Sequence, residues 1–432
     1  MRLLSILLPL VLAVAATPAR SAEPDLAPVA VALAKVRATH GINRERDAGP
    51  ELTPVKQALR AWIEPQLPAN PKSIGRDGAV EELTSEDLAV LSARLNTSLD
   101  AAGLLCGDDD SPANPCSGSP TAAQNERGYV DGVSIGLLDG GRYLSVVTGV
   151  GIKCGYDQSA YIYKHGPSGR WTLLLATEQN NYGEGDYAPQ MFVSIGGASG
   201  GPDWDHPTPP LVVTLGFHPW CSSNWQTLYT RLWRASDTNP TPRPLLDRGD
   251  SLYIGGDRIA AARLTPTDLL VEYRGNTIDA DSIIRTHVLH YRIQAGDTLD
   301  RIAPVALSPN DFVDEWVTST PPEAARWSDP AADPAALAAL HLRATAALDV
   351  AADFGGAAKR CRSDPTLWQV SVFGIAGEGK ADPPPVYYKV RWMAPYRFTL
   401  VDGGLRPFVG CDEEVAMPDD VGTLFPAQVW AP

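Results

Sequence analysis

The stretch Val133-Ser134-Ile135-Gly136 recurs as Val193-Ser194-Ile195-Gly196, and Leu252-Tyr253-Ile254-Gly255 is a weaker third copy. The glycines that end these stretches are 60 and 59 residues apart. Each stretch is short, rich in strand-forming residues and bounded by turn residues, which is typical of a β-strand. A near-constant spacing of this kind indicates an internal repeat. We therefore interpret the three stretches as the first strand of a repeated unit.

Three further strands are expected in each unit, because apolar residues at strand spacing follow every copy. The second strands are predicted at 144–148, 211–215 and 269–273, the third at 160–164, 228–233 and 288–293, and the fourth at 171–176, 244–247 and 302–307. A stretched fourth copy has strands predicted at 312–317, 368–373, 387–392 and 396–401. Between the first two of these, 333–354 is predicted as an inserted helix, with Asp333 as its cap and Pro334 as its first residue.

Four strands per unit of about 60 residues is the pattern of a β-propeller blade. A single four-stranded meander cannot bury both faces, and stacking the units around an axis solves this problem. The predicted fold is therefore mainly β, with a β-propeller-like body of four to five blades. The alternative is a tandem β-sandwich, which also has short strands joined by turns.

The N-terminal residues 1–22 have the features of a secretory signal peptide. Arg2 precedes an apolar run at 3–16, and Ala19-Arg20-Ser21 gives a small-residue cleavage site. An uncleaved anchor is the alternative. No later apolar run approaches 18 residues, so no membrane span is expected in the mature chain. The predicted localisation is secreted or periplasmic.

Residues 23–105 are predicted to form a helical N-terminal segment. Thr53 is expected to cap a helix whose first residue is Pro54, and Ser85 is expected to cap a second helix. Leucines at helical spacing give that helix one apolar face. Residues 106–127 are rich in Gly, Pro, Asp, Asn and Ser and are predicted to be a linker, and 128–432 forms the β body.

The charge balance excludes one class of partner. The 432-residue chain has 36 lysine and arginine residues against 51 aspartate and glutamate residues, a formal net charge of −15. Binding to nucleic acid depends on clustered positive charge that neutralises phosphates. A nucleic-acid partner is therefore not expected.

Six cysteines in a chain with an export signal indicate three disulfides. The loop between Cys106 and Cys116 is short enough to be closed by one bond. Cys154 and Cys221 each lie ten residues after the start of a second strand. They therefore occupy equivalent loops of neighbouring units, which favours a bond between them. Cys361 and Cys411 remain for the third bond. A zinc site is the competing interpretation, but the sequence has neither CxxC nor HExxH.

Several short motifs resemble reactive or metal sites without the required context. Ser134 and Ser199 lie in G-x-S-x-G patterns, but neither is followed by the helix that a nucleophile elbow requires. His287 and His290 are three apart in a predicted strand, so they should lie on opposite faces as ordinary histidines in contact with solvent. The acidic stretches 108–110 and 203–206 are interpreted as solvated loops. No metal and no cofactor is predicted.

The repeat places two long loops, 178–187 and 217–225, at the same rim of the body as the loops joining second and third strands. Aromatic, amide and acidic side chains converge on that rim, and such a set suits a sugar ring or a peptide. The candidate ligand-binding residues are Asp157, Tyr182, Glu184, Asp186, His218, Trp220 and Trp225.

The expected function is that of an exported, cell-envelope protein that binds a protein or a carbohydrate. One alternative is a secreted glycan hydrolase or lyase that uses rim carboxylates such as Glu184 and Asp186. Another is a structural partner in an envelope complex that docks through the N-terminal helical segment and the helix predicted at 333–354. The sequence leaves open whether the protein is an enzyme.

Overall fold

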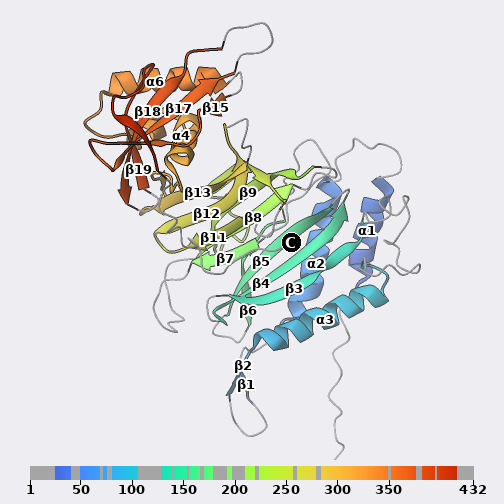
Figure 1. Ribbon diagram of the computed structural model, residues 1–432. Helices are drawn as coiled ribbons and strands as arrows, with labels where there is room; N and C mark the ends of the chain where they lie inside the picture. The colour runs from blue at the N-terminus through green and yellow to red at the C-terminus, as the bar shows by residue number, and fades with distance from the viewer. Residues whose placement is uncertain are drawn as a thin grey trace, which may run out of the picture.

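The computed structural model describes residues 25–39, 49–68, 72–74, 80–105, 128–138, 141–152, 155–165, 170–178, 192–196, 210–218, 223–255, 260–278, 284–348, 352–375, 382–394 and 397–415. Over these residues the protein is mainly β, with several antiparallel sheets and a smaller helical part (Figure 1). Within the same residues, no helix is both long and apolar enough to cross a membrane.

Helices dominate the N-terminal part. The elements are α1 (Ala27–Thr39), α2 (Gly49–Ile63), the 3-10 turn η1 (Glu64–Gln66), the hairpin β1 (Lys72–Ile74) and β2 (Val80–Glu82), and α3 (Ser85–Ala101). Helix α2 begins at Gly49, so the start predicted at Thr53 and Pro54 is wrong, and Pro54 lies inside the helix. The cap of α3 is Thr84, one residue before the predicted Ser85, because Thr84 and Asp87 form a reciprocal capping box. Leu88, Leu95 and Leu99 form the buried stripe of α3.

The first sheet consists of β3 (Val130–Leu138), β4 (Tyr143–Ile152), β5 (Gly155–His165) and β6 (Trp171–Ala176), paired in chain order. Its residues share one apolar core with the three N-terminal helices. Figure 1 shows the helices lying along this sheet. The amphipathic N-terminal segment is therefore packed against the first sheet.

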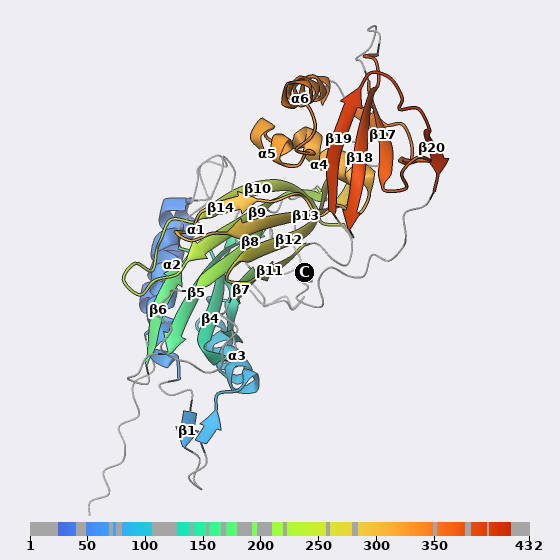
Figure 2. The same cartoon turned by 90° about the vertical axis from the view of Figure 1, so that its left-hand side faces the viewer.

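Two more four-stranded meanders follow, and both are antiparallel in chain order. The second sheet contains β7 (Phe192–Gly196), β8 (Leu211–His218), β9 (Trp225–Arg234) and β10 (Leu246–Tyr253), and the third contains β11 (Ala260–Leu264), β12 (Asp268–Asn276), β13 (Ile284–Ile293) and β14 (Leu299–Arg301). One apolar cluster joins the first sheet to the second, and another joins the second to the third. The three sheets are thus stacked face to face (Figures 1 and 2).

The C-terminal part combines three helices with a six-stranded sheet. The helices are α4 (Pro309–Thr318), α5 (Pro321–Arg326) and α6 (Pro334–Leu348), and the strands are β15 (Ala352–Phe354), β16 (Lys359–Cys361), β17 (Leu367–Gly374), β18 (Val386–Ala394), β19 (Arg397–Gly404) and β20 (Cys411–Glu414). The main strand order is β19-β18-β17-β16-β20, and β15 pairs with β17. Figure 2 shows the helices together on one side of this sheet, with which they share a core. The inserted helix expected at 333–354 corresponds to α6, but the helix ends at Leu348, and residues 352–354, predicted as helix, form β15 instead.

The strand predicted at 312–317 is wrong, because these residues belong to α4. Ser308 caps this helix through its hydroxyl group, and Pro309 stands at its first position. Phe312, Val313 and Trp316 are buried at helical spacing. The C-terminal sheet therefore does not begin with a strand equivalent to β3.

Two strands of the third unit also lie elsewhere than predicted. Leu252 and Tyr253 end β10 rather than begin the third sheet, which starts at β11. The predicted strand at 302–307 is replaced by β14, which ends at Arg301. No closed ring of sheets is detected within the described ranges.

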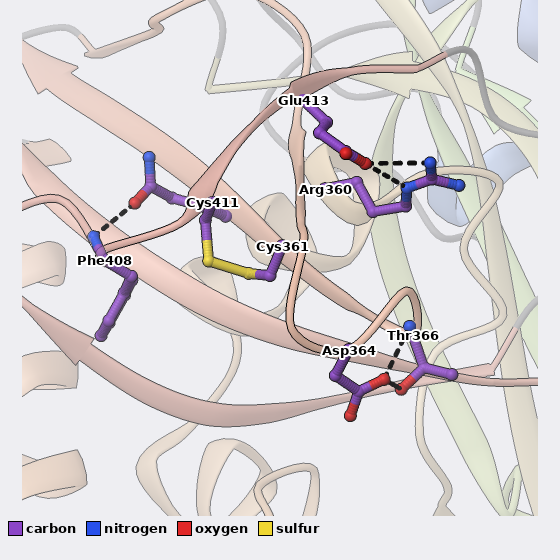
Figure 3. Close-up of a disulfide and its surroundings, with 8 residues drawn as sticks. Arg360, Cys361, Asp364, Thr366, Phe408, Cys411 and Glu413 are labelled. Carbon is purple, nitrogen blue, oxygen red and sulfur yellow. Dashed lines mark hydrogen bonds and ion pairs between the residues drawn. A yellow bond between two sulfur atoms is a disulfide. The ribbon is translucent and has the colours of Figure 1, made fainter.

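Cys361 and Cys411 form a disulfide, as the sequence predicts, between residues separated by 50 positions. The bond connects β16 to β20, and Arg360 and Glu413 form an ion pair at 2.9 Å beside it (Figure 3). On β17, the side-chain oxygen of Gln369 accepts a hydrogen bond of 2.6 Å from the Phe408 backbone amide. Cys106, Cys116, Cys154 and Cys221 lie outside the described residues, so their pairing stays a prediction.

Candidate functional site

A cavity of about 700 Å³ lies where the end of α2 and the η1 turn meet β5 and β6. Its walls combine charged, aromatic and apolar side chains. They are Arg60, Glu64, Pro65, Leu67, Pro68, Tyr163, Arg170, Trp171 and Leu173. We call this space the α2–β6 cavity.

Helix α2 supplies one wall because its apolar residues face the first sheet. Leu59, Trp62 and Ile63 are buried in the shared core, so Arg60 and Glu64 are directed to the edge of that packing. Arg60 Nε lies 2.6 Å from Glu178 Oε1, and Arg60 Nη1 lies 3.3 Å from Glu64 Oε1. Burial opposes the charge of Arg60, but these two carboxylates outweigh burial and raise its pKa. The charge of Arg60 is thus already balanced.

Tyr163 provides a neutral hydroxyl group in the cavity. Burial, and next the negative charge of Glu64, raise the pKa of Tyr163 well above its usual range. Its hydroxyl group donates a hydrogen bond of 3.2 Å to Glu64 Oε1. Glu64 is consequently held by both a phenol and a guanidinium group.

Trp171 and Arg170 form the other wall, at the start of β6. Trp171 is half-buried, its indole N–H donates to the Pro68 carbonyl at 2.9 Å, and the His165 ring packs edge-on against it at 5.4 Å. These contacts fix the indole plane. Arg170 is exposed and makes no ion pair with any residue that the structure describes.

Deeper along α2, Asp157 is ion-paired rather than free at the rim. Its Oδ2 atom lies 2.7 Å from Lys56 Nζ, and the two side chains are 3% and 1% exposed. Asp157 therefore connects β5 to α2 in this structure. Its predicted contact with a ligand stays a prediction.

Trp225 is the other predicted ligand-binding residue whose side chain is described. It is half-buried at the start of β9, and its ring lies 5.3 Å from that of Tyr253 in a tilted arrangement. The Arg274 guanidinium lies 5.4 Å from the centre of the Tyr253 ring. His218 is the last residue of β8. Tyr182, Glu184, Asp186 and Trp220 lie outside the described residues.

The expectation that both strand histidines touch solvent is wrong for His287, which is buried. Its Nδ1 atom lies 2.7 Å from Glu315 Oε1, and its Nε2 atom lies 2.7 Å from the Asn276 carbonyl oxygen. His290 instead contacts Asp268 at 2.9 Å. The two histidines thus have separate partners.

The remaining motifs give no reactive centre where they are described. Ser134 lies inside β3, without a strand-to-helix turn. Ser199 and the acidic stretches 108–110 and 203–206 are outside the described ranges. Among the residues that are described, no three histidine, cysteine, aspartate or glutamate side chains are grouped as a metal site.

Sequence reasoning missed Arg170 and Trp171 as site residues and assigned Trp171 only to a strand. The available signal was a cation and an indole directly after the turn-forming stretch Gly166-Pro167-Ser168-Gly169. Residues at the end of such a turn are common in binding sites. Comparison of the chain with models of protein families and with curated protein sequences gives no match.

Proposed function

We propose that the chain is an exported glycan-binding protein whose α2–β6 cavity holds a sugar residue that carries a carboxylate. The observation behind this proposal is the pair Arg170 and Trp171 at one wall of the cavity. A guanidinium group that has no ion pair among the described residues, beside an indole, suits an acidic sugar.

Arg170 supports the acidic character of the ligand. The protein has a formal net charge of −15, and Arg60 in the same cavity is already paired with two carboxylates. Of the two arginines that line this cavity, Arg170 is the one without a carboxylate partner among the described residues, so its guanidinium group can bind an anionic ligand. A guanidinium group binds a carboxylate in a planar, two-point arrangement.

Trp171 and Tyr163 support a sugar ring rather than a simple anion. An indole held in place by Pro68 and His165 offers a flat apolar surface for the C–H face of a pyranose. Tyr163 and Glu64 add a hydroxyl and a carboxylate group that hydrogen-bond sugar hydroxyls. The cavity volume of about 700 Å³ is within the range of small-ligand sites.

The test compares oligogalacturonate with its methyl-esterified form by calorimetry on the full chain. We expect the free acid to bind more tightly, and Arg170→Gln to remove that preference. A hydrogen bond to a charged group contributes about 1.5–3 kcal/mol, which corresponds to roughly 10- to 100-fold in Kd. Arg406→Gln, at an exposed arginine of the C-terminal part, is the matched control.

Equal affinity for the acid and the ester would contradict the proposal, as would loss of binding in Arg406→Gln. Shortening of the oligosaccharide during the experiment would favour the hydrolase or lyase alternative, which relies on Glu184 and Asp186. If no glycan binds and a protein partner is retained instead, the glycan proposal is wrong and the chain is a protein-binding protein.

We also propose that the three four-stranded meanders are copies of one unit, arranged as neighbouring blades. Their identical strand order, their face-to-face packing and the contact between β7 and β11, the first strands of two neighbouring units, support this. The Cys361–Cys411 disulfide supports export to an oxidising compartment.

A further inference from the structure

A second cavity, of about 190 Å³, lies among the helices of the C-terminal part, far along the chain from the α2–β6 cavity. Its lining residues come from α4, α5, α6 and the segment between α5 and α6. Figure 2 shows these three helices side by side. We call this space the α4–α6 cavity.

The walls are mostly apolar. Alanine, proline, leucine and the ring of Trp316 make up most of the lining, and its ionisable residues are Asp329 and His341. The indole N–H of Trp316 is already used, because it donates to the Ala324 carbonyl at 3.0 Å and to the Ser328 hydroxyl at 3.2 Å. Trp316 therefore offers a ligand its ring surface only.

Asp329 is also fully engaged. Its Oδ2 atom lies 2.8 Å from Arg391 Nη1, and its Oδ1 atom accepts the Ala331 backbone N–H at 2.9 Å. The ion pair balances the charge at this wall. Neither a cationic nor an anionic ligand would gain a partner here, so the fitting ligand is neutral.

His341 is the lining residue that still has a polar atom available to a ligand. It is 4% exposed, and its ring packs edge-on against Trp316 at 5.0 Å. Its Nε2 atom is buried and has no hydrogen-bond partner among the residues that the structure describes. A buried polar atom without a partner is unfavourable, and a ligand group that pairs with it gains that energy on binding.

We propose that the α4–α6 cavity is a binding site for a small neutral aromatic alcohol, with its hydroxyl group hydrogen-bonded to His341 Nε2. An apolar cavity of about 150 Å³ binds benzene, so this space accommodates a single substituted ring. A hydroxyl group pairs with either neutral tautomer of imidazole, because it both donates and accepts. The site is independent of glycan binding in the α2–β6 cavity.

The test uses phenol and toluene, which have similar shape and differ in the hydroxyl group. Binding to the full chain is measured by calorimetry or by ligand-observed NMR. We expect phenol to bind about tenfold more tightly than toluene, the effect of one buried hydrogen bond. In His341→Phe phenol should bind no more tightly than toluene, because its hydroxyl group loses its partner, and the affinity for toluene should stay within about twofold of the parent.

A cavity-filling variant keeps the proposal testable if His341→Phe does not fold. Ala338 is an exposed lining residue of α6, so Ala338→Leu should abolish binding of both ligands. The control is Ala339→Leu, the same change at the next position of α6, which is exposed and does not line the cavity. Equal binding of phenol and toluene to the parent protein would overturn the proposal. Binding that persists in Ala338→Leu would place the site elsewhere and overturn it too.

Discussion

Lys56 on α2 and Asp157 on β5 form an ion pair of 2.7 Å, with side chains 1% and 3% exposed. The pair is enclosed by the core that the N-terminal helices share with the first sheet. It joins residues that are far apart in the sequence. The helical segment and the first sheet are therefore connected by a charge interaction as well as by apolar packing.

Replacing Lys56 with methionine should destabilise the protein by about 3–5 kcal/mol, because it leaves the Asp157 carboxylate buried without its cation. Urea unfolding followed by circular dichroism measures the change. The double variant Lys56→Met/Asp157→Leu should recover part of the loss. Lys35→Met, on the exposed face of α1, is the control. An effect of Lys56→Met no larger than that of the control would contradict the prediction.

Glu315 should make stability depend on pH in the acid range. Burial opposes its ionisation, but Arg285, His287 and Arg301 outweigh burial and hold the pKa of Glu315 well below its usual value of 4.5. A lowered pKa in the folded state adds stability that is present above the usual value and is lost as the pH falls toward the folded value. Unfolding measured between about pH 3 and about pH 7 should show a loss toward acid that is smaller in Glu315→Gln.

The Glu315→Gln variant should also be less stable at neutral pH, by about 3 kcal/mol, since Arg285 and Arg301 lose a shared anion. Glu86→Gln, at an exposed position of α3, should leave the pH profile unchanged. A parallel profile for the parent and Glu315→Gln would show that this carboxylate does not control acid stability.

The Cys361–Cys411 disulfide should contribute about 2–4 kcal/mol, because it limits the freedom of the unfolded chain between the two residues. The variant Cys361→Ala/Cys411→Ala, measured by thermal and urea unfolding, should show this loss. Reduction of the parent under the same conditions should cost at least as much, because it also breaks the other disulfides predicted from the sequence. An unchanged midpoint in the double variant would contradict the prediction.

Gly403 on β19 lets α6 approach the C-terminal sheet closely. A Cβ atom at this position would overlap the buried side chain of Leu340. Gly403→Ala should therefore destabilise the protein by about 1–3 kcal/mol. In the background Leu340→Ala the same change should cost less, and the coupling is measured in a double-mutant cycle. Additive effects would show that the two residues do not press on one another.

The two central strands of each of the first three sheets could be predicted from the sequence. The predicted second and third strands of the first three units fall inside β4 and β5, β8 and β9, and β12 and β13. These strands are eight to eleven residues long and are packed by sheets or helices, so their apolar pattern is strong. Strand β14 has three residues and β11 has five, which is too little pattern to fix an edge strand from sequence alone.

The strand at 312–317 was predicted from the spacing of the repeat, although the local sequence pattern is that of a helix. Ser308-Pro309 is a helix start, and Phe312, Val313, Trp316 and Val317 repeat at helical rather than at strand spacing. The local pattern alone therefore predicts the helix that the structure shows. Only the first strand of the fourth copy is wrong, because the other predicted strands, 368–373, 387–392 and 396–401, correspond to β17, β18 and β19.

The α2–β6 cavity could not be predicted, because it depends on tertiary contacts. Arg60 and Glu178, whose ion pair lies at its edge, are 118 positions apart in the sequence. The rim chosen from the repeat gave Asp157 and Trp225, which the structure places in an ion pair and in an aromatic pair. The pattern of the sequence did not indicate that α2 packs against the first sheet and brings Lys56 to Asp157.

The chain-order pairing of the first three sheets has a consequence for how the protein is made. Each meander ends before the next begins, as β6 ends at Ala176 and β7 starts at Phe192. A chain that emerges with its N-terminus first can finish one sheet before the following one exists. Until then Ile162 and Leu175 on the outer face of the first sheet lack Val212 and Trp233 of the second. The apolar outer face of the first sheet therefore stays exposed until the second sheet packs against it. At the other end of the chain, β20 pairs with β16 only after the intervening strands have been made, since Cys361 and Cys411 are 50 positions apart.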